Sequence, residues 1–375
     1  ERWVDSDGLF SFERESSAVT LLSNRTDGGF DSRTLSHVGF APGTYLVELT
    51  GNAADSQRDP FNDIPEVVQV FDDAGVNKVN VRFPRNANAN GELQVELFYA
   101  DQIVPTGELF QALQRGTIDG VHSDDDSMAS PTPVRSFGGY FPLATKHALD
   151  VPVLFNQYGL ADIWREEYAK VGVHWLSAAG QDPFNFNTVK PIKSLADMDG
   201  LKLYTFPTAG RFLSQFGVVP VNIPYEDAEV AVQTGELDGM AWSGITEDYT
   251  VGWADVTNYF CTNNISGAWI GSFFVNAEKW AELPDHLKQI VNSAVEASHT
   301  YRNQWYWGGE ARLRASGEKL ELTSVPQDEW KVVEEAAVKF WDEMAEEGET
   351  AAKIVQIFRD YNNVISKAGP PYTFG

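Results

Sequence analysis

The chain has 375 residues, and its 28 Lys and Arg against 54 Asp and Glu give a formal net charge of −26. This charge excludes nucleic acid and anionic membrane surfaces as expected partners, because both are negatively charged themselves. A hydrophobic content of 43% and an aromatic content of 13% predict a folded chain, and the length predicts two domains.

The first 90 residues are the hardest part of the chain to assign, because Gly, Pro and Asn separate short apolar runs. Runs at 18–22 and 44–49 predict strands, and a run at 64–71 predicts a helix. The chain begins at Glu1 with no apolar segment typical of an export signal. We therefore expect a mature chain from which such a signal has been removed.

From Leu93 to Tyr99 apolar and polar residues alternate, which predicts a strand with one buried face. A helix is expected next at 106–114, with Thr106 as its N-cap residue and an acidic residue in its first turn.

A nine-residue pattern occurs twice, at 112–120 and at 231–239. Both copies carry Ala, Gln, Gly, Asp and Gly at the same five positions. The pattern predicts a helix that ends at Gly116 or Gly235 and is followed directly by a strand. The two copies indicate two α/β lobes that are built alike. A chance match between two common helix ends is the alternative.

Strands and helices are expected to alternate between the two copies and beyond them, which predicts mostly parallel sheets. The expected strands lie at 151–155, 173–177, 201–206, 218–223 and 269–275. The expected helices lie at 161–170, 210–216 and 225–233.

The last 90 residues predict long helices. Apolar residues with a spacing of three and four follow Pro284. Ser324 and Gln327 form a capping-box pattern before an apolar face that includes Trp330, Phe340 and Trp341. Gly348 interrupts this helix, which resumes over 352–365. A helix of this length at the end of a chain straps two lobes together or packs against a second subunit.

Motifs for catalysis and for nucleotide binding are absent from the sequence. Cys261 is the only cysteine, so an internal disulfide is excluded. The three carboxylates of Asp124–Asp126 are expected in a solvated loop, with a ligand-facing carboxylate or a metal site as alternatives. Three adjacent side chains point in different directions, which disfavours the metal site. Because catalytic motifs and a nucleophile–base pair are absent, we expect a binding protein rather than an enzyme.

From Glu92 onward the chain resembles the solute-binding subunit of tripartite ATP-independent periplasmic (TRAP) transporters, DctP-type. Four ordered motifs carry the resemblance, and the Trp-Gly element points to the branch that binds 2-oxo acids and lactate. The motifs are Leu93–Tyr99 with Gln111–Gly120, the segment Lys190–Lys202, Ala231–Gly239 with Trp242 and Gly244, and Phe274–Pro284.

The resemblance implies a two-lobed α/β fold, like that of periplasmic binding proteins, with a hinge and a long C-terminal helix. Lobe I would comprise 1–155 and 256–323, lobe II 156–255, and a helical segment 324–375. The lobes would close over a small organic solute in the periplasm and deliver it to the TRAP membrane subunits. A homodimer through the C-terminal helix is a further expectation.

Two departures from the family pattern concern the ligand. Family members carry an Arg after the Gly-Leu-Lys run, where it clamps a substrate carboxylate, but this chain has Leu203-Tyr204. In the 2-oxo-acid branch an acidic residue before the Trp ligates a metal that bridges to the substrate, and here that residue is Ala241. We therefore expect no cofactor, with a metal-bridged ligand as the alternative.

The ligand-binding residues expected from the resemblance and from their types are aromatic or acidic, with one arginine. They are Tyr99, Asp126, Phe184, Tyr204, Phe206, Arg211, Trp242, Glu247, Asp248 and Trp269. Aromatic faces beside carboxylates favour an amine-bearing, zwitterionic or neutral solute. The alternatives are an organic acid held by Arg211 and a metal-dependent enzyme that uses the Asp124–Asp126 loop.

Overall fold

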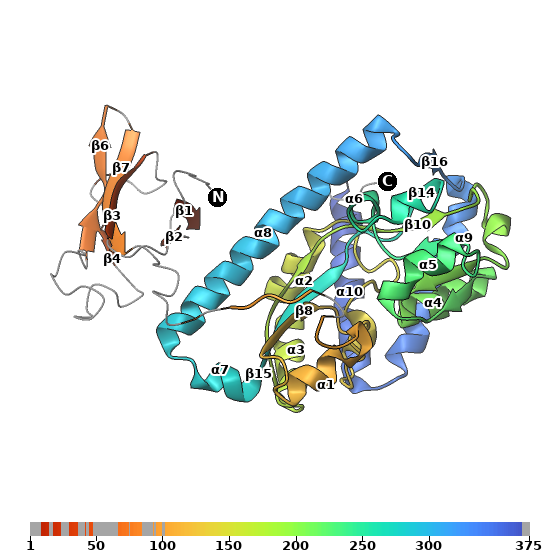
Figure 1. The fold of residues 1–375 in the computed structure, drawn as a ribbon, viewed down its shortest axis with the longest axis horizontal. Coiled ribbons are helices and arrows are strands. Elements are labelled where there is room, and N and C mark those ends of the chain that lie inside the picture. The colour runs from red at the N-terminus through yellow and green to blue at the C-terminus, as the bar shows by residue number, and fades with distance from the viewer. Residues whose placement is uncertain are drawn as a thin grey trace. The chain divides into compact units, whose positions relative to one another are not determined.

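The computed structural model describes residues 9–14, 18–23, 30–36, 42, 45–47, 67–74, 76–84, 93, 95–99 and 102–369. The chain forms two compact units (Figure 1), and each is described by itself. The first unit comprises Glu1–Leu97 and Leu283–Ala294, and the second comprises Phe98–Glu282 and Val295–Gly375. Among the described residues, no helix combines the length and the apolar character that crossing a bilayer requires.

The first unit contains short antiparallel strands. They are β1 (Leu9–Arg14) with β2 (Ala18–Ser23), β3 (Phe30–Ser36) with β7 (Val76–Pro84) and β6 (Phe71–Asp73), and β4 (Tyr45–Val47) with β5 (Val67–Gln69). The predicted strands at 18–22 and 44–49 are confirmed as β2 and β4. The predicted helix at 64–71 is wrong, because its β-branched valines form β5 and Val70 is buried beside it.

The alternating segment Leu93–Tyr99 forms no strand in its described residues, so this prediction is wrong. Val95 is 81% exposed and Tyr99 is 73% exposed. An alternating pattern becomes a strand only where a neighbouring strand supplies hydrogen bonds, and here none of the described strands pairs with this segment.

The second unit holds two sheets. The smaller sheet is antiparallel, with the order β8 (Gly120–Ser123), β15 (Ile270–Asn276), β9 (Val173–Gly180). Two helices, α2 (Asp150–Gln157) and α3 (Leu160–Ala169), pack against β9. The predicted strand at 151–155 is wrong, because its buried side chains recur at the three- and four-residue spacing of α2.

The larger sheet has six strands in the order β12-β11-β13-β10-β14-β16. Its strands are β10 (Phe184–Thr188), β11 (Lys202–Thr205), β12 (Val219–Val221), β13 (Gly239–Ala241), β14 (Tyr259–Ser266) and β16 (Glu321–Thr323). β11 runs parallel to β12 and β13, and β14 runs parallel to β16, whereas β10 is antiparallel to both of its neighbours. The prediction of mostly parallel sheets is therefore wrong for the smaller sheet and correct in part for the larger one.

The predicted lobe boundaries remain a prediction. They place β9 in the second lobe, whereas β9 pairs with β15 of the first.

Helices cover the sheets and join the strands. The remaining α-helices are α1 (Leu109–Gln114), α4 (Pro207–Leu213), α5 (Ala228–Gln233), α6 (Ile245–Thr250), α7 (Ala277–Glu282), α8 (Asp285–Ser316), α9 (Gln327–Ala345) and α10 (Glu349–Ala368). Short 3₁₀ helices lie at Thr106–Glu108, Arg135–Phe137, Leu195–Met198, Ser214–Phe216, Tyr225–Asp227 and Trp253–Asp255. Two predicted caps, Thr106 and Ser324, are wrong. The N-cap residue is Pro105 for the first of these turns and Pro326 for α9, and neither makes a side-chain capping hydrogen bond.

The C-terminal helices α9 and α10 pack on each other, and α10 also contacts α2 and α3. The predicted apolar face of α9 is confirmed, since Trp330, Phe340 and Trp341 are buried. Phe340 and Trp341 contact the ring of Phe141 within the same chain. This face is therefore part of the core of the second unit, and the predicted homodimer remains a prediction.

The repeated nine-residue pattern folds in the same way both times. α1 ends before Gly116 (φ +72°) and leads into β8, and α5 ends before Gly235 (φ +76°) and leads into β13. Both glycines adopt the left-handed conformation that side chains disfavour. The predicted helix–glycine–strand element is thus confirmed in both copies.

Candidate functional site

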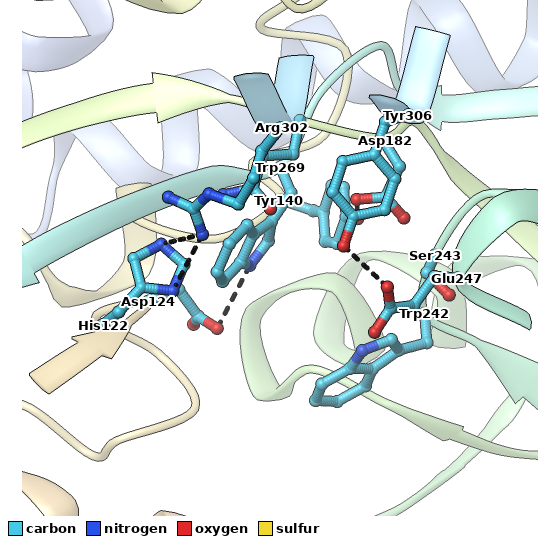
Figure 2. A pocket seen from close by; sticks show the side chains of 11 residues that line it. His122, Asp124, Tyr140, Asp182, Trp242, Ser243, Glu247, Trp269, Arg302 and Tyr306 are labelled. Atoms are coloured by element: carbon cyan, nitrogen blue, oxygen red, sulfur yellow. Dashed lines mark hydrogen bonds between the residues drawn. The ribbon is translucent and has the colours of Figure 1, made fainter. Parts of the chain in front are cut away.

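A cavity of about 230 Å³ lies within the second unit, where strands of both sheets end. Its lining residues are His122, Asp124, Tyr140, Gln181, Asp182, Trp242, Ser243, Glu247, Trp269, Arg302 and Tyr306. Five of them directly follow the carboxyl ends of β8, β9 and β13, the position at which open α/β sheets bind ligands. α6 and α8 supply further lining residues (Figure 2).

The acidic pair of the cavity is Asp182 and Glu247. Asp182 accepts hydrogen bonds from the Tyr140 hydroxyl at 3.1 Å and from the backbone N–H of Gly244 at 2.8 Å. Glu247 accepts one from the Tyr306 hydroxyl at 2.7 Å. Within the described part of the chain, neither carboxylate has an ion-pair partner.

Burial raises the pKa of Asp182 well above its usual range, and the charge of Glu247 adds to this shift. Burial also raises the pKa of Glu247, against the opposing hydrogen bond from Tyr306. Two buried carboxylates without a cation are electrostatically unfavourable, so a positively charged ligand group placed beside them is stabilised.

A third carboxylate, Asp124, lines the cavity beside Trp269. It accepts a hydrogen bond from the Trp269 indole N–H at 3.2 Å and one from the backbone N–H of Ser127 at 2.7 Å. Burial is the main cause that raises the pKa of Asp124 to about 7. This carboxyl group therefore changes its charge close to neutral pH.

The predicted solvated loop at Asp124–Asp126 is wrong, since all three side chains are at most 3% exposed. As predicted, they point in different directions, because each has different partners. Asp125 accepts hydrogen bonds from the Trp164 indole and the Tyr168 hydroxyl, and Asp126 from the backbone N–H of Thr208 and the Arg135 guanidinium. In the described ranges, no three His, Cys, Asp or Glu residues are grouped so that they could hold a metal ion.

The indole of Trp242 forms an aromatic wall of the cavity. The predicted site residues Tyr204 and Phe206 do not line the cavity but stack on this indole, with ring centroids 4.7 Å and 3.7 Å away. They hold the indole in place by stacking on its faces, and burial raises the pKa of the Tyr204 hydroxyl. Trp242, Glu247 and Trp269 are the three predicted site residues that line the cavity.

Two further predicted residues lie one layer behind the lining. Phe184 stacks on Tyr140 with centroids 4.9 Å apart. Asp248 accepts a hydrogen bond from the Ser243 hydroxyl at 3.1 Å. Both side chains are buried.

The other three predicted residues lie away from the cavity lining. Tyr99 is exposed, and Asp126 pairs with Arg135. The half-exposed guanidinium of Arg211 pairs with Glu347. Its charge is thus neutralised outside the cavity.

The opposite side of the cavity carries one cation, Arg302, with His122, Trp269 and Asp124 near it. Figure 2 shows Arg302 and His122 at one side and Glu247 with Trp242 at the other. Arg302 Nη1 lies 2.6 Å from His122 Nε2, and Nη2 lies 3.3 Å from Nδ1 of His299. Burial, and then the charge of Arg302, lower the pKa of both imidazoles, that of His299 to about 3. Burial lowers the pKa of Arg302 to about 10, so the guanidinium stays charged beside neutral histidines.

Sequence reasoning missed most of the lining residues. Gln181 and Asp182 follow the carboxyl end of β9. Because α/β sheets bind ligands at the carboxyl ends of their strands, these two residues could have been predicted. Arg302 and Tyr306 are four residues apart on α8 and share one helix face. No sequence signal distinguishes this pair from ordinary polar positions on a helix.

The model of "Bacterial extracellular solute-binding protein, family 7" (DctP) matches residues 81–348. A monocarboxylate 2-oxoacid-binding periplasmic protein of Nostoc sp. is 28% identical over 240 residues, which are 62% of this chain and 65% of that protein. The chain thus spans slightly less than two thirds of this relative.

Solved structures share the fold. A TRAP periplasmic solute-binding protein of Chromohalobacter salexigens with bound (S)-2-amino-1-propanol is 66% identical. The match covers 76% of this chain and 90% of that one, with a TM-score of 0.75. A TRAP periplasmic solute-binding protein of Pseudoalteromonas atlantica with bound sodium and pyruvate is 20% identical, with a TM-score of 0.61 and coverages of 70% and 80%.

These likenesses confirm the predicted two-lobed α/β fold and do not support the alternative of a metal-dependent enzyme. The chain belongs to family 7 of the bacterial extracellular solute-binding proteins, the DctP family of TRAP-type binding proteins, which are not enzymes.

Proposed function

We propose that the chain is the extracytoplasmic receptor of a TRAP transporter and that it captures a small organic cation bearing an amino group. The observation that carries the proposal is the buried pair Asp182 and Glu247, which has no cation partner within the described residues. An ammonium group would neutralise this pair. Trp242 lines the cavity beside this pair.

The dimensions of the cavity suit a compact solute. Its volume of about 230 Å³ lies below the roughly 300–1,000 Å³ typical of pockets for larger ligands. The Chromohalobacter relative, which holds (S)-2-amino-1-propanol, supports an amine of this size. We take the two sheets of the second unit as the cores of two lobes that close over the solute and present it to the membrane subunits in the periplasm.

An organic acid is the second candidate, favoured by the name of the Nostoc relative and by the presence of Arg302 in the cavity. Three lining carboxylates oppose it, since they would repel a carboxylate ligand. Its proposed anchor, Arg211, pairs with Glu347 instead. A sodium or calcium ion that bridges the ligand to the protein would need other acidic residues, because Ala241 stands where the 2-oxo-acid branch has its metal-ligating acid.

Calorimetric titration of the purified chain at pH 7.5 tests the proposal. The ligands share one carbon skeleton: 2-amino-1-propanol, 1,2-propanediol, lactate and pyruvate, the two acids with and without added calcium. We expect saturable binding of the amine without turnover, and no binding of the diol or the acids. Tighter binding of lactate or pyruvate would replace the proposal with the organic-acid candidate.

Removing the acidic pair checks where the ammonium group binds. Asp182→Asn and Glu247→Gln should each weaken amine binding at least about tenfold, because each removes a buried negative charge next to the cation. Glu236→Gln, an exposed carboxylate outside the cavity, is the matched control and should bind as the wild type does. Equal affinities for all four proteins would disprove this assignment.

A further inference from the structure

Two buried hydrogen-bond donors of the cavity lining have no acceptor among the described residues. They are Nε2 of Gln181 and Nε of Arg302, and both residues line the cavity. Buried donors are almost always paired in folded proteins, and a donor left without an acceptor is costly. An acceptor atom on the ligand would satisfy them.

The side-chain amide of Gln181 and the Trp269 ring both lie close to Gly271. The backbone N–H of Gln181 donates to the carbonyl of Trp269 at 3.1 Å. A methyl group at Gly271 would lie 2.8 Å from Nε2 of Gln181 and 2.2 Å from the Trp269 ring. Only glycine at 271 therefore leaves room for the amide beside the indole.

The two terminal nitrogens of Arg302 contact histidines. Its Nη1 lies within hydrogen-bond distance of His122 and its Nη2 of His299, whereas its Nε has no acceptor among the described residues. A hydroxyl oxygen has two lone pairs, so it can accept one hydrogen bond from Gln181 Nε2 and one from Arg302 Nε. Three lining carboxylates against one guanidinium disfavour a negative charge on the ligand, and therefore a carboxylate group at this position.

We propose that Gln181 and Arg302 form the hydroxyl-binding side of the site, so that the solute is an amino alcohol cation with its ammonium group at Asp182 and Glu247. This assignment rests on the proposed function, since it takes the amine end of the ligand as given. It makes Gln181 and Arg302 the residues that distinguish an amino alcohol from a plain amine and from an amino acid.

The test uses three ligands that differ at one position: 2-amino-1-propanol, 2-aminopropane without the hydroxyl, and alanine with a carboxylate. For the wild-type chain we expect 2-aminopropane and alanine to bind at least about tenfold more weakly than the amino alcohol. Gln181→Met and Arg302→Lys should each weaken amino alcohol binding about tenfold and leave 2-aminopropane binding unchanged.

The outcomes separate the two proposals. If 2-aminopropane binds as tightly as the amino alcohol, or if a variant weakens both amines equally, the hydroxyl assignment is wrong while the amine receptor stands. Tighter binding of alanine would show that this side holds a carboxylate. If no amine binds to the wild-type chain, the proposed function fails and the assignment fails with it. Gln181→Met keeps the test decisive should Arg302→Lys not fold.

Discussion

The two copies of the repeated element, α1–β8 and α5–β13, have the same backbone and deliver different side chains to one cavity. The first copy ends in Asp124, a carboxylate with a raised pKa, and the second ends in Trp242 and Ser243. In both copies a left-handed glycine ends the helix before the strand begins. The residue after the strand is free to differ, and it determines the chemistry of the site.

The largest effect is expected from removing the indole delivered by the second copy. Trp242→Ala should weaken amine binding at least tenfold, about 1.4 kcal/mol, because it removes an aromatic wall of the cavity. Calorimetry measures the change. Trp280→Ala is the control, since this indole stacks on His174 and does not line the cavity. Unchanged affinity in Trp242→Ala would discard the cavity as the binding site.

The carboxylate delivered by the first copy predicts a pH dependence. Asp124 has a pKa of about 7, so below pH 7 a proton competes with the cationic ligand. Amine affinity should rise by up to about tenfold from pH 5.5 to 7.5, and Asp124→Asn should flatten this rise. A pH profile that Asp124→Asn does not change would remove Asp124 from the explanation.

The same raised pKa has the opposite effect on the ligand-free protein. Between about pH 4 and pH 7 the folded chain keeps a proton on Asp124 that the unfolded chain has released. The free energy of unfolding should therefore decrease as the pH rises through this window. Thermal unfolding without ligand measures this trend, and increasing stability over the window would contradict it.

The shared backbone predicts a matched loss of stability in the two copies. Gly116→Ala and Gly235→Ala should each cost about 1 kcal/mol, because both place a side chain at positive φ without a steric clash. Gly308→Ala in α8 is the control, and it should have the opposite sign. Alanine has the higher helix propensity, so the free energy of unfolding should increase by at most about 1 kcal/mol. Unequal losses at Gly116 and Gly235 would show that the two copies are not equivalent.

The smallest effect is expected behind the cavity wall. Tyr204 contributes its ring to the stack on Trp242, and it does not line the cavity. Tyr204→Phe keeps this ring and should change amine affinity less than about twofold. A larger loss would show that the Tyr204 hydroxyl contacts the ligand directly.

Local patterns in the sequence predicted much of the second unit. The spacing of apolar residues identified α3, α8 and α9, and the glycines at 116 and 235 identified two helix ends. Predictions from local patterns failed where contacts between distant parts of the chain determine the secondary structure. The run at 151–155 is apolar enough for either a strand or a helix, and its packing against β9 determines the helix.

The cavity was only partly predictable for the same reason. Trp242 and Trp269 were identified from the family pattern and from residue type. Gln181 and Asp182 needed the end of β9 to be placed correctly, and Arg302 needed the docking of α8. Tyr204 and Phe206 were predicted to contact the ligand. The sequence does not distinguish an aromatic residue that lines a cavity from one that stacks on the lining residue.

The two indoles in the cavity wall give the protein an intrinsic optical reporter. Trp242 and Trp269 are two of 11 tryptophans, and both line the cavity. Capture of the solute should thus change their fluorescence emission. Because Trp269 donates its N–H to Asp124, the emission of the ligand-free protein should also shift around neutral pH. Occupancy can therefore be followed in real time without any added dye.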